Sequence, residues 1–174
     1  MNATGPVIVG RCWVFGDDID TDVIIPSKYV ALRDFTEMAK HALEPVEPNF
    51  GTQCRPGDIV VAGKSFGIGS SREAAALVFK VLGVGAIVAE SYARIFFRNA
   101  INNGLYAIEA PGVRSIVNPG DSIYIDLQGG RVFNPSTGAE VPIVPWPPMV
   151  LALVQAGGLV PFLKSRRGST AAQL

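Results

Sequence analysis

The sequence predicts an α/β fold in which a mixed sheet is flanked by helices. Short apolar strands alternate with helix-favouring segments in the middle of the chain, and a hairpin pattern follows Pro111. The length of 174 residues, with 48% hydrophobic and 17% charged residues, suits one folded domain with one core. We therefore expect residues 1–174 to form a single domain, with a frayed tail at about 164–174.

The first third of the chain is predicted to form one strand, followed by loops and a helical stretch. Residues 7–15 are mostly apolar and β-favouring, which predicts a strand, and the acidic stretch 16–22 predicts a loop. A helical stretch is expected near 27–43, after Pro26. Residues 44–57 contain three prolines and predict a long loop, which suggests a functional use.

The middle of the chain has a β-α-β-α-β pattern. Apolar strands are expected at 58–62, 84–89 and 105–108. One helix is expected from Ser70 onward, and a second at 91–102 is followed by a glycine that would end it. This alternation predicts right-handed crossovers and a parallel sheet covered by helices.

The pattern changes in the last third of the chain. Residues 122–127 and 131–133 flank a Gln-Gly-Gly turn, which predicts an antiparallel hairpin. A proline-rich crossing leads to a helix expected at 149–156, where two glycines end it. The sheet is therefore expected to be mixed.

Composition and charge exclude several classes of protein. Fifteen basic residues balance fifteen acidic ones, which argues against binding to nucleic acid or to an anionic membrane. No apolar run reaches the roughly 18 residues of a spanning helix, and no signal peptide is visible, so we expect a cytoplasmic protein. Cys12 and Cys54 fit neither a disulfide scaffold nor a zinc site, so we expect reduced thiols and no metal on this chain. The mean hydropathy of +0.30 indicates either a buried subunit interface or a dense core.

The segment with the most chemistry joins the first middle strand to its helix and has the sequence GKSFGIGSSRE at 63–73. Ser70, followed three residues later by Glu73, predicts a capping box at the start of the helix. Free N–H groups, the helix dipole and two glycines suit an anion, and Arg72 offers a guanidinium fork for a carboxylate. The alternative is a capped helix after a glycine turn, with Arg72 in a surface ion pair.

Spacing excludes two phosphate-binding motifs. A Walker loop needs Gly-Lys-Ser at its end, whereas Gly63-Lys64-Ser65 begins this loop and has no glycine five positions upstream. A dinucleotide fingerprint needs a third glycine where Arg72 stands.

Four segments together resemble the mobile domain of the aconitase superfamily, over about residues 8–163. These segments are GSSRE at 69–73, DTDVIIP at 20–26, RPGD at 55–58 and SYARIFFRN at 91–99. One departure is Ala74, where the family commonly has histidine. In isopropylmalate isomerases and homoaconitases this domain is a separate small subunit. The resemblance implies an aconitase-type swivelling β/β/α domain that works with a large catalytic subunit.

The resemblance also implies an activity and its cofactor. The expected reaction is that of a hydro-lyase, which interconverts 2-isopropylmalate and 3-isopropylmalate by dehydration and rehydration in leucine biosynthesis. The family's [4Fe-4S] cluster is expected on the large subunit, because cluster ligation uses three cysteines and this chain has two. By the same resemblance Ser70 is the base, and Arg72 stabilises its alkoxide. The substrate carboxylate is expected to bind at Gly69, Ser71 and Arg72.

Substrate choice depends, by resemblance, on a loop after the Ile-Ile-Pro segment. Ala31 and Leu32 occupy the discriminating positions, and an apolar surface favours an isopropyl group over a second carboxylate. Arg33 lies one residue further along, and a one-residue shift of register would favour homoaconitate or a methyl-substituted malate. The substrate class is therefore a small 2-hydroxy di- or tricarboxylate.

Other polar residues have two interpretations each. Arg94 and Arg98, one helical turn apart, either face the site or pair with acids, and we favour the pairing. His41, the only histidine, is expected at a loop or helix end rather than as a ligand. A further loop is either a polar turn or a substrate or intersubunit element near the same pocket, and its residues are Asp20, Thr21 and Asp22.

A hypothesis of a different class stays open. The same glycine loop would serve a non-catalytic anion-binding or assembly domain that docks to a partner without contributing chemistry. Mixing with a cluster-bearing large subunit separates the two hypotheses, and self-association of the isolated chain is compatible with either.

Overall fold

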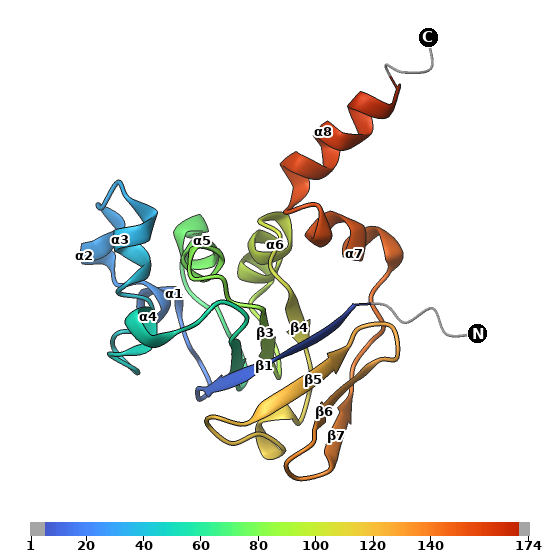
Figure 1. The fold of residues 1–174 in the computed structure, drawn as a ribbon. Coiled ribbons are helices and arrows are strands. Elements are labelled where there is room, and N and C mark those ends of the chain that lie inside the picture. Colours follow the sequence, from blue (N-terminus) through green and yellow to red (C-terminus); the bar gives the residue numbers. More distant parts are fainter. Residues whose placement is uncertain (1–5, 171–174) are drawn as a thin grey trace.

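The computed structural model describes residues 6–170, which are built around one seven-stranded mixed sheet (Figure 1). The strand order is β4-β3-β2-β1-β5-β6-β7. The first four strands along the chain pair in parallel, whereas β5 pairs antiparallel to β1 and continues into an antiparallel β5-β6-β7 meander. The strands are β1 (Val7–Val14), β2 (Ile59–Ala62), β3 (Ala86–Ala89), β4 (Ala107–Glu109), β5 (Ser122–Asp126), β6 (Arg131–Asn134) and β7 (Ala139–Pro142).

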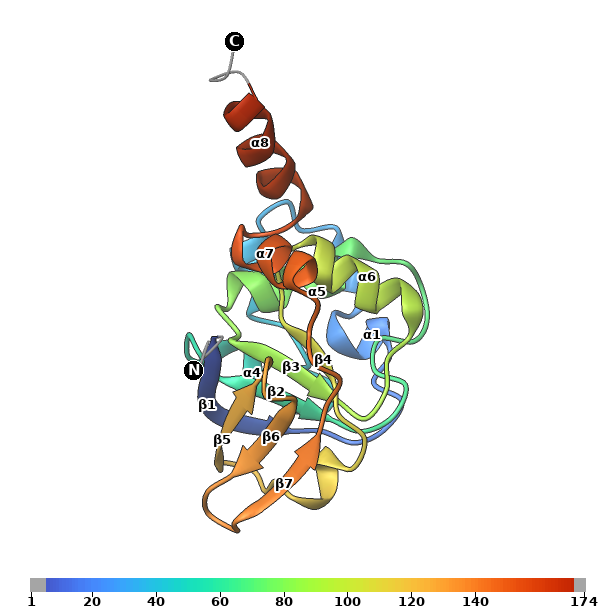
Figure 2. The same cartoon turned by 90° about the vertical axis from the view of Figure 1, so that its right-hand side faces the viewer.

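Helices cover one face of the parallel half of the sheet (Figures 1 and 2). Four short helices follow β1, α5 and α6 connect the parallel strands, and α8 projects away from the body of the molecule. The helices are α1 (Thr21–Ile24), α2 (Ser27–Val30), α3 (Phe35–Ala39), α4 (Phe50–Gln53), α5 (Glu73–Val81), α6 (Arg94–Asn102), α7 (Pro148–Gln155) and α8 (Leu159–Thr170), with a 3-10 turn η1 (Val113–Ser115).

The central parallel strands β2 and β3 are buried on both faces, and their alternate residues enter two different cores. Val60 and Ile87 pack with the helices, whereas Ile59 and Val88 pack with residues of the antiparallel half such as Ile125. Successive strand side chains point to opposite faces, so one strand can supply both cores. The result is a helix layer, a parallel layer and an antiparallel layer that curls over the far side (Figure 2). The expected α/β fold with a mixed sheet and flanking helices is confirmed.

Several expected elements differ in detail from those observed. The helix expected near 27–43 is two short helices, because Asp34 starts α3 by accepting a hydrogen bond from the Thr36 amide over 2.7 Å. The loop expected at 44–57 contains α4, and the sequence pattern missed β7 and η1 altogether. Helix α8 continues as far as Thr170 through the segment expected to be frayed, of which 171–174 lie outside the described residues.

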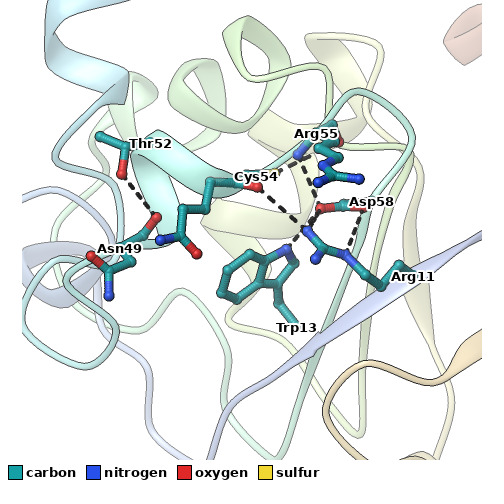
Figure 3. Close-up of polar contacts among 8 residues, drawn as sticks. Arg11, Trp13, Asn49, Thr52, Cys54, Arg55 and Asp58 are labelled. Carbon is teal, nitrogen blue, oxygen red and sulfur yellow. Dashed lines mark hydrogen bonds and ion pairs between the residues drawn. The ribbon is translucent and has the colours of Figure 1, made fainter.

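A charged cluster joins β1 to the start of β2 (Figure 3). The carboxylate of Asp58 accepts hydrogen bonds from Arg11 Nη2 (2.7 Å), Trp13 Nε1 (2.8 Å) and the Arg55 amide (3.0 Å). Burial alone would raise the pKa of Asp58, but these hydrogen bonds hold that pKa below its ordinary value. The Arg-Pro-Gly-Asp motif at 55–58 therefore stabilises the sheet at the end opposite the glycine loop.

Within residues 6–170 no single helix is long and apolar enough to cross a bilayer. Among the described residues, α7 and the first part of α8 together have the length and apolar composition of a span, but they are bent by 99° relative to each other.

Candidate functional site

The glycine loop between β2 and α5 passes close to α6 and α1. Gly67 has a φ of +80°, and a Cβ there would lie 2.2 Å from the ring of Phe96. Gly69 has a φ of +105°, and its Cβ would lie 3.0 Å from Thr21 Oγ1. Both positions need glycine, because side chains rarely adopt positive φ and nearby atoms leave little space.

The Asp-Thr-Asp loop lies directly against the glycine loop. The Thr21 amide donates to the carbonyl of Ile68 over 2.8 Å, and the Gly67 amide donates to that of Ile19 over 2.7 Å. These bonds bring the hydroxyl oxygens of Thr21 and Ser70 to 3.1 Å, although the residues are 49 positions apart. Thr21 is 2% exposed, whereas Ser70 lies at the surface.

Arg72 is held by two residues from the α1–α2 region. Its guanidinium donates from Nη1 to Asp22 Oδ1 over 2.5 Å and from Nη2 to Ser27 Oγ over 3.1 Å. The Ser27 hydroxyl in turn donates to Asp22 Oδ1 over 2.6 Å. Hydrogen bonds from Ser27 and then Arg72 hold the pKa of Asp22 below its ordinary value. Sequence analysis missed Ser27, because a single hydroxyl after Ile-Ile-Pro gives no pattern of its own.

The capping box predicted at Ser70 and Glu73 is wrong. Helix α5 begins at Glu73, its N-cap residue is Arg72, and no side chain caps it. The Ser70 carbonyl accepts from the Arg72 amide over 2.8 Å, which forms a tight turn before the helix, and the Ser70 hydroxyl contacts Thr21 instead. The first amides of α5 therefore have no side-chain cap.

The three residues of the Asp-Thr-Asp loop have different surroundings. Asp20 Oδ1 accepts from the Val23 amide over 2.8 Å and caps α1, as expected of a polar turn. Thr21 and Asp22 face the glycine loop, as expected of residues near the same site.

The motif at 91–99 supports the glycine loop from the other side. Ser91 accepts two hydrogen bonds from the loop, one on its hydroxyl from the Ser65 amide (2.9 Å) and one on its carbonyl from the Phe66 amide (3.0 Å). The Tyr92 hydroxyl is buried, donates to the Ile87 carbonyl over 2.7 Å and accepts from the Ile108 amide over 3.2 Å. Burial raises the pKa of Tyr92, so its role here is structural.

Arg94 and Arg98 are exposed on α6. The ion pairs expected of them are not formed within the part of the chain that the structure describes, so that expectation is wrong.

The residues expected to choose the substrate lie at the far end of α2 from Ser27. Ala31 is the C-cap of α2, and Leu32, which follows it, is 39% exposed. Helix α2 thus connects the Arg72 network to the apolar pair. His41 lies just beyond α3, at a helix end as expected, and stacks on Tyr29.

The candidate site is an open surface. Gly69, Ser70 and Ser71 are exposed, and the Arg72 side chain is 26% exposed. A cavity of about 720 Å³ lies elsewhere, between α6, β4 and the segment 142–147, where Phe97 and Trp146 line it.

The two cysteines do not fit an iron–sulfur cluster. Burial raises the pKa of the Cys12 thiol and of the Cys54 thiol to about 12, so both are protonated at neutral pH. Both thiols are free. No three His, Cys, Asp or Glu side chains among the described residues lie close enough together to hold a metal ion.

Comparison with protein families supplies the deciding observation: residues 24–112 match the model of the aconitase C-terminal domain. The chain belongs to the aconitase C-terminal domain family. The match includes the glycine loop and the motif at 91–99. The resemblance drawn from the four motifs is thereby confirmed.

Curated relatives within this family have one name in common. The chain is 48% identical over 158 residues to "3-isopropylmalate dehydratase small subunit 1" of Methanopyrus kandleri, covering 91% of this chain and 93% of the relative. It is 51% identical over 160 residues to "3-isopropylmalate dehydratase small subunit" of Pyrobaculum calidifontis, covering 92% and 99%.

A solved structure has the same aconitase C-terminal domain fold. The crystal structure of a 3-isopropylmalate dehydratase from Methanocaldococcus jannaschii superposes with a TM-score of 0.90 at 38% sequence identity. The superposition covers 97% of this chain and all of the other. The likeness therefore extends over nearly the whole length of both chains.

Proposed function

We propose that the chain is the small subunit of a 3-isopropylmalate dehydratase, a hydro-lyase of leucine biosynthesis. The names and the near-complete coverage of its relatives support this function. The observation that supports the chemistry is the pairing of two loops that are distant in the sequence. The pairing brings the Ser70 hydroxyl to 3.1 Å from the Thr21 hydroxyl, and it places the guanidinium of Arg72 against Asp22 of the same loop.

Ser70 is the proposed base that takes the carbon-bound proton of the substrate. An unactivated hydroxyl is far too weak for this task, so its alkoxide needs stabilisation. Three groups of this chain supply it: the Thr21 hydroxyl as a hydrogen-bond donor, the uncapped amides at the start of α5 and the guanidinium of Arg72. The helix dipole contributes only about 0.3–1 kcal/mol at an exposed end, so the guanidinium and desolvation carry the larger part.

Arg72 is also the proposed anchor for a substrate carboxylate, together with the exposed turn at Gly69 and Ser71. A guanidinium has five N–H donors, and its contacts to Asp22 and Ser27 use two. The other three suit a carboxylate, and the existing contacts fix the plane of the group in advance. Asp22 therefore orients Arg72 in this proposal, while Asp20 acts only as a helix cap.

The proposed substrate is an isopropylmalate. Ala31 and Leu32 present an exposed apolar surface beyond α2, which suits a branched alkyl group and would leave a second carboxylate unpaired. Arg33 is exposed one residue further on, so homoaconitate or a methyl-substituted malate is the alternative.

A large catalytic subunit is the proposed partner. The exposure of Ser70 and Ser71 fits a site that a second protein completes. The [4Fe-4S] cluster implied by the family is placed on that subunit, since the thiols of this chain do not suit it. Two free thiols accord with a cytoplasmic location.

The base assignment is tested by Ser70→Ala in the pair reconstituted with a cluster-bearing large subunit. Loss of a positioned base should lower kcat by about 10²–10⁴-fold, as measured by isopropylmalate turnover. The Ser70 hydroxyl does not cap α5 but bonds to the buried Thr21 hydroxyl, so urea unfolding should place the variant about 1 kcal/mol below the parent chain. Ser122→Ala, at the exposed start of β5, is the matched control and should change neither quantity. Turnover of Ser70→Ala within a few-fold of normal would refute the role.

Substrate class is tested by turnover of the same pair on isopropylmalate and on homocitrate. The apolar loop predicts a strong preference for isopropylmalate, and a preference for the tricarboxylate would overturn that assignment. Formation of a complex without turnover of either would instead support a non-catalytic assembly domain.

A further inference from the structure

Helix α2 has little to hold it besides side-chain contacts, although its partly buried Tyr29 packs against the core. It has four residues, none of them fully buried, and Pro26 at its N-cap gives no side-chain hydrogen bond. Isolated helices of this length are unstable, because the first turn costs more entropy than its few hydrogen bonds return. The position of α2, and of Ala31 and Leu32 after it, therefore depends on side-chain contacts.

Three side chains form a closed clasp on α2, namely Tyr29, His41 and Glu44. The rings of Tyr29 and His41 stack with centroids 3.7 Å apart and planes 7° apart. The Tyr29 hydroxyl donates to Glu44 Oε1 over 3.0 Å, and Glu44 Oε2 lies 2.6 Å from His41 Nδ1. Each member thus contacts the other two.

Lys28 adds to the clasp from the same helix. Its ammonium lies 4.6 Å from the centre of the Tyr29 ring and 3.7 Å from Glu44 Oε1. This ammonium is largely exposed, so it adds less than the stacked and hydrogen-bonded members.

The other half of the clasp is anchored in the core. His41 and Glu44 flank Ala42 and Leu43, which are 1% and 0% exposed. The Leu43 amide donates to the Ile24 carbonyl of α1 over 2.9 Å. The clasp therefore ties a helix without buried residues to a segment that the fold holds firmly.

We propose that His41 and Glu44 are positioning residues that fix the substrate-discriminating loop at Ala31 and Leu32 through Tyr29. This proposal rests on the proposed function of that loop. The Tyr29 hydroxyl and both Glu44 oxygens make their hydrogen bonds within the clasp. The proposal also gives the only histidine of the chain a role, which is to hold the loop and not to transfer a proton.

The test uses the pair reconstituted with the large subunit and three small-subunit variants. His41→Ala removes the stacked ring, Glu44→Ala removes both hydrogen bonds, and His41→Phe restores a ring at position 41. Glu37→Ala is the matched control, because Glu37 forms an exposed ion pair with Lys40 on neighbouring α3 and has no contact with the clasp. The readouts are KM and kcat for isopropylmalate and hydrogen exchange of amides 27–33 in the free small subunit.

A loosened loop weakens substrate binding without touching the proton transfer. Both alanine variants should raise KM roughly tenfold, which corresponds to one lost hydrogen bond or stack, and leave kcat within about twofold. Exchange at 27–33 should accelerate while β2 and β3 stay protected, and His41→Phe should recover most of the KM. Glu37→Ala should match the parent pair.

Two results separate this proposal from the function on which it rests. A parent pair that does not turn over isopropylmalate ends the proposed function, and the exchange rates then still decide whether the clasp holds the loop. An active parent pair in which both alanine variants keep the KM and exchange rates of Glu37→Ala would overturn the clasp. A fall in kcat at unchanged KM would overturn it as well.

Discussion

At the scale of single residues, the glycine loop depends on positions where a Cβ cannot fit. Gly67 and Gly138 share a positive φ, +80° and +72°, but their surroundings differ. A Cβ at Gly67 would lie 2.2 Å from the Phe96 side chain, whereas Gly138, in the turn between β6 and β7, has open space. Alanine substitutions at these two positions therefore distinguish the free-energy cost of backbone strain from the cost of steric crowding.

We predict that Gly138→Ala lowers the free energy of unfolding by about 1 kcal/mol, since only the left-handed backbone is strained. Gly67→Ala should cost a further 1–3 kcal/mol or so, because Phe96 or the loop must move. Urea unfolding of both variants measures the difference. Equal losses for the two variants would mean that the loop does not pass Phe96 as closely as the structure has it.

At the scale of elements, the candidate site is made by contacts between helix ends and loops. Ser27, the first residue of α2, bonds to Arg72, the N-cap of α5, and to Asp22 within α1. Three short elements thus share one hydrogen-bond network. Their relative placement decides where the guanidinium lies.

We predict that Ser27→Ala raises the pKa of Asp22 toward its ordinary value, because the Ser27 hydrogen bond is the largest cause of its lowering. A lowered carboxyl pKa means that the charged network is intact above the ordinary pKa of aspartate, about 3.9, and is lost as the pH falls through the lower folded value. An NMR titration of the Asp22 carboxyl carbon in the small subunit measures this shift. Ser27→Thr, which keeps a hydroxyl, should retain the low value, and an unchanged pKa in Ser27→Ala would contradict the network.

At the scale of the whole molecule, the two ends of β2 have different tasks. Asp58 precedes the strand and Gly63 follows it, so about 13 Å of strand separates the charged cluster from the glycine loop. The cluster in Figure 3 joins β1 to β2 through Arg11 and Trp13. We therefore expect substitutions in the charged cluster to change stability without changing the proposed chemistry of the glycine loop.

We predict that Asp58→Asn lowers the free energy of unfolding by roughly 1–2 kcal/mol at pH 7, because it removes the charge from a carboxylate that is 7% exposed, while its partner Arg11 stays partly in solvent. Since the pKa of Asp58 is lowered on folding, this stabilisation exists above the ordinary aspartate pKa and is lost as the pH falls through the folded value. The difference between variant and parent in urea should thus shrink at pH 3.

Glu140→Gln is the control for that measurement, because the ion pair of Glu140 with Arg131 is more than half exposed and should contribute less than about 1 kcal/mol. The reconstituted Asp58→Asn pair should keep its kcat, and a large loss of turnover in a folded variant would show that the two ends are coupled.

The sequence by itself determined the elements whose signal is local. Apolar strands, glycine stops and the hairpin turn are encoded within about ten residues, so β1 to β6, α6 and α7 were predicted in kind. The order of four family motifs was likewise readable without a structure, and it identified the family and the segment around Ser70 and Arg72.

Only the tertiary structure decided how those segments meet. The capping box predicted at Ser70 does not form, although its local sequence pattern is complete. The Ser70 hydroxyl instead bonds to Thr21, which lies 49 residues away in the sequence. The roles of Ser27 and of the clasp on Tyr29 could not be predicted from the sequence for the same reason. Single polar residues acquire such roles only when the fold brings their partners within hydrogen-bonding distance. A hydrogen bond needs its two atoms to be about 3 Å apart. The spacing of residues in the sequence predicts such a distance within one helix, strand or turn, but not between separate elements.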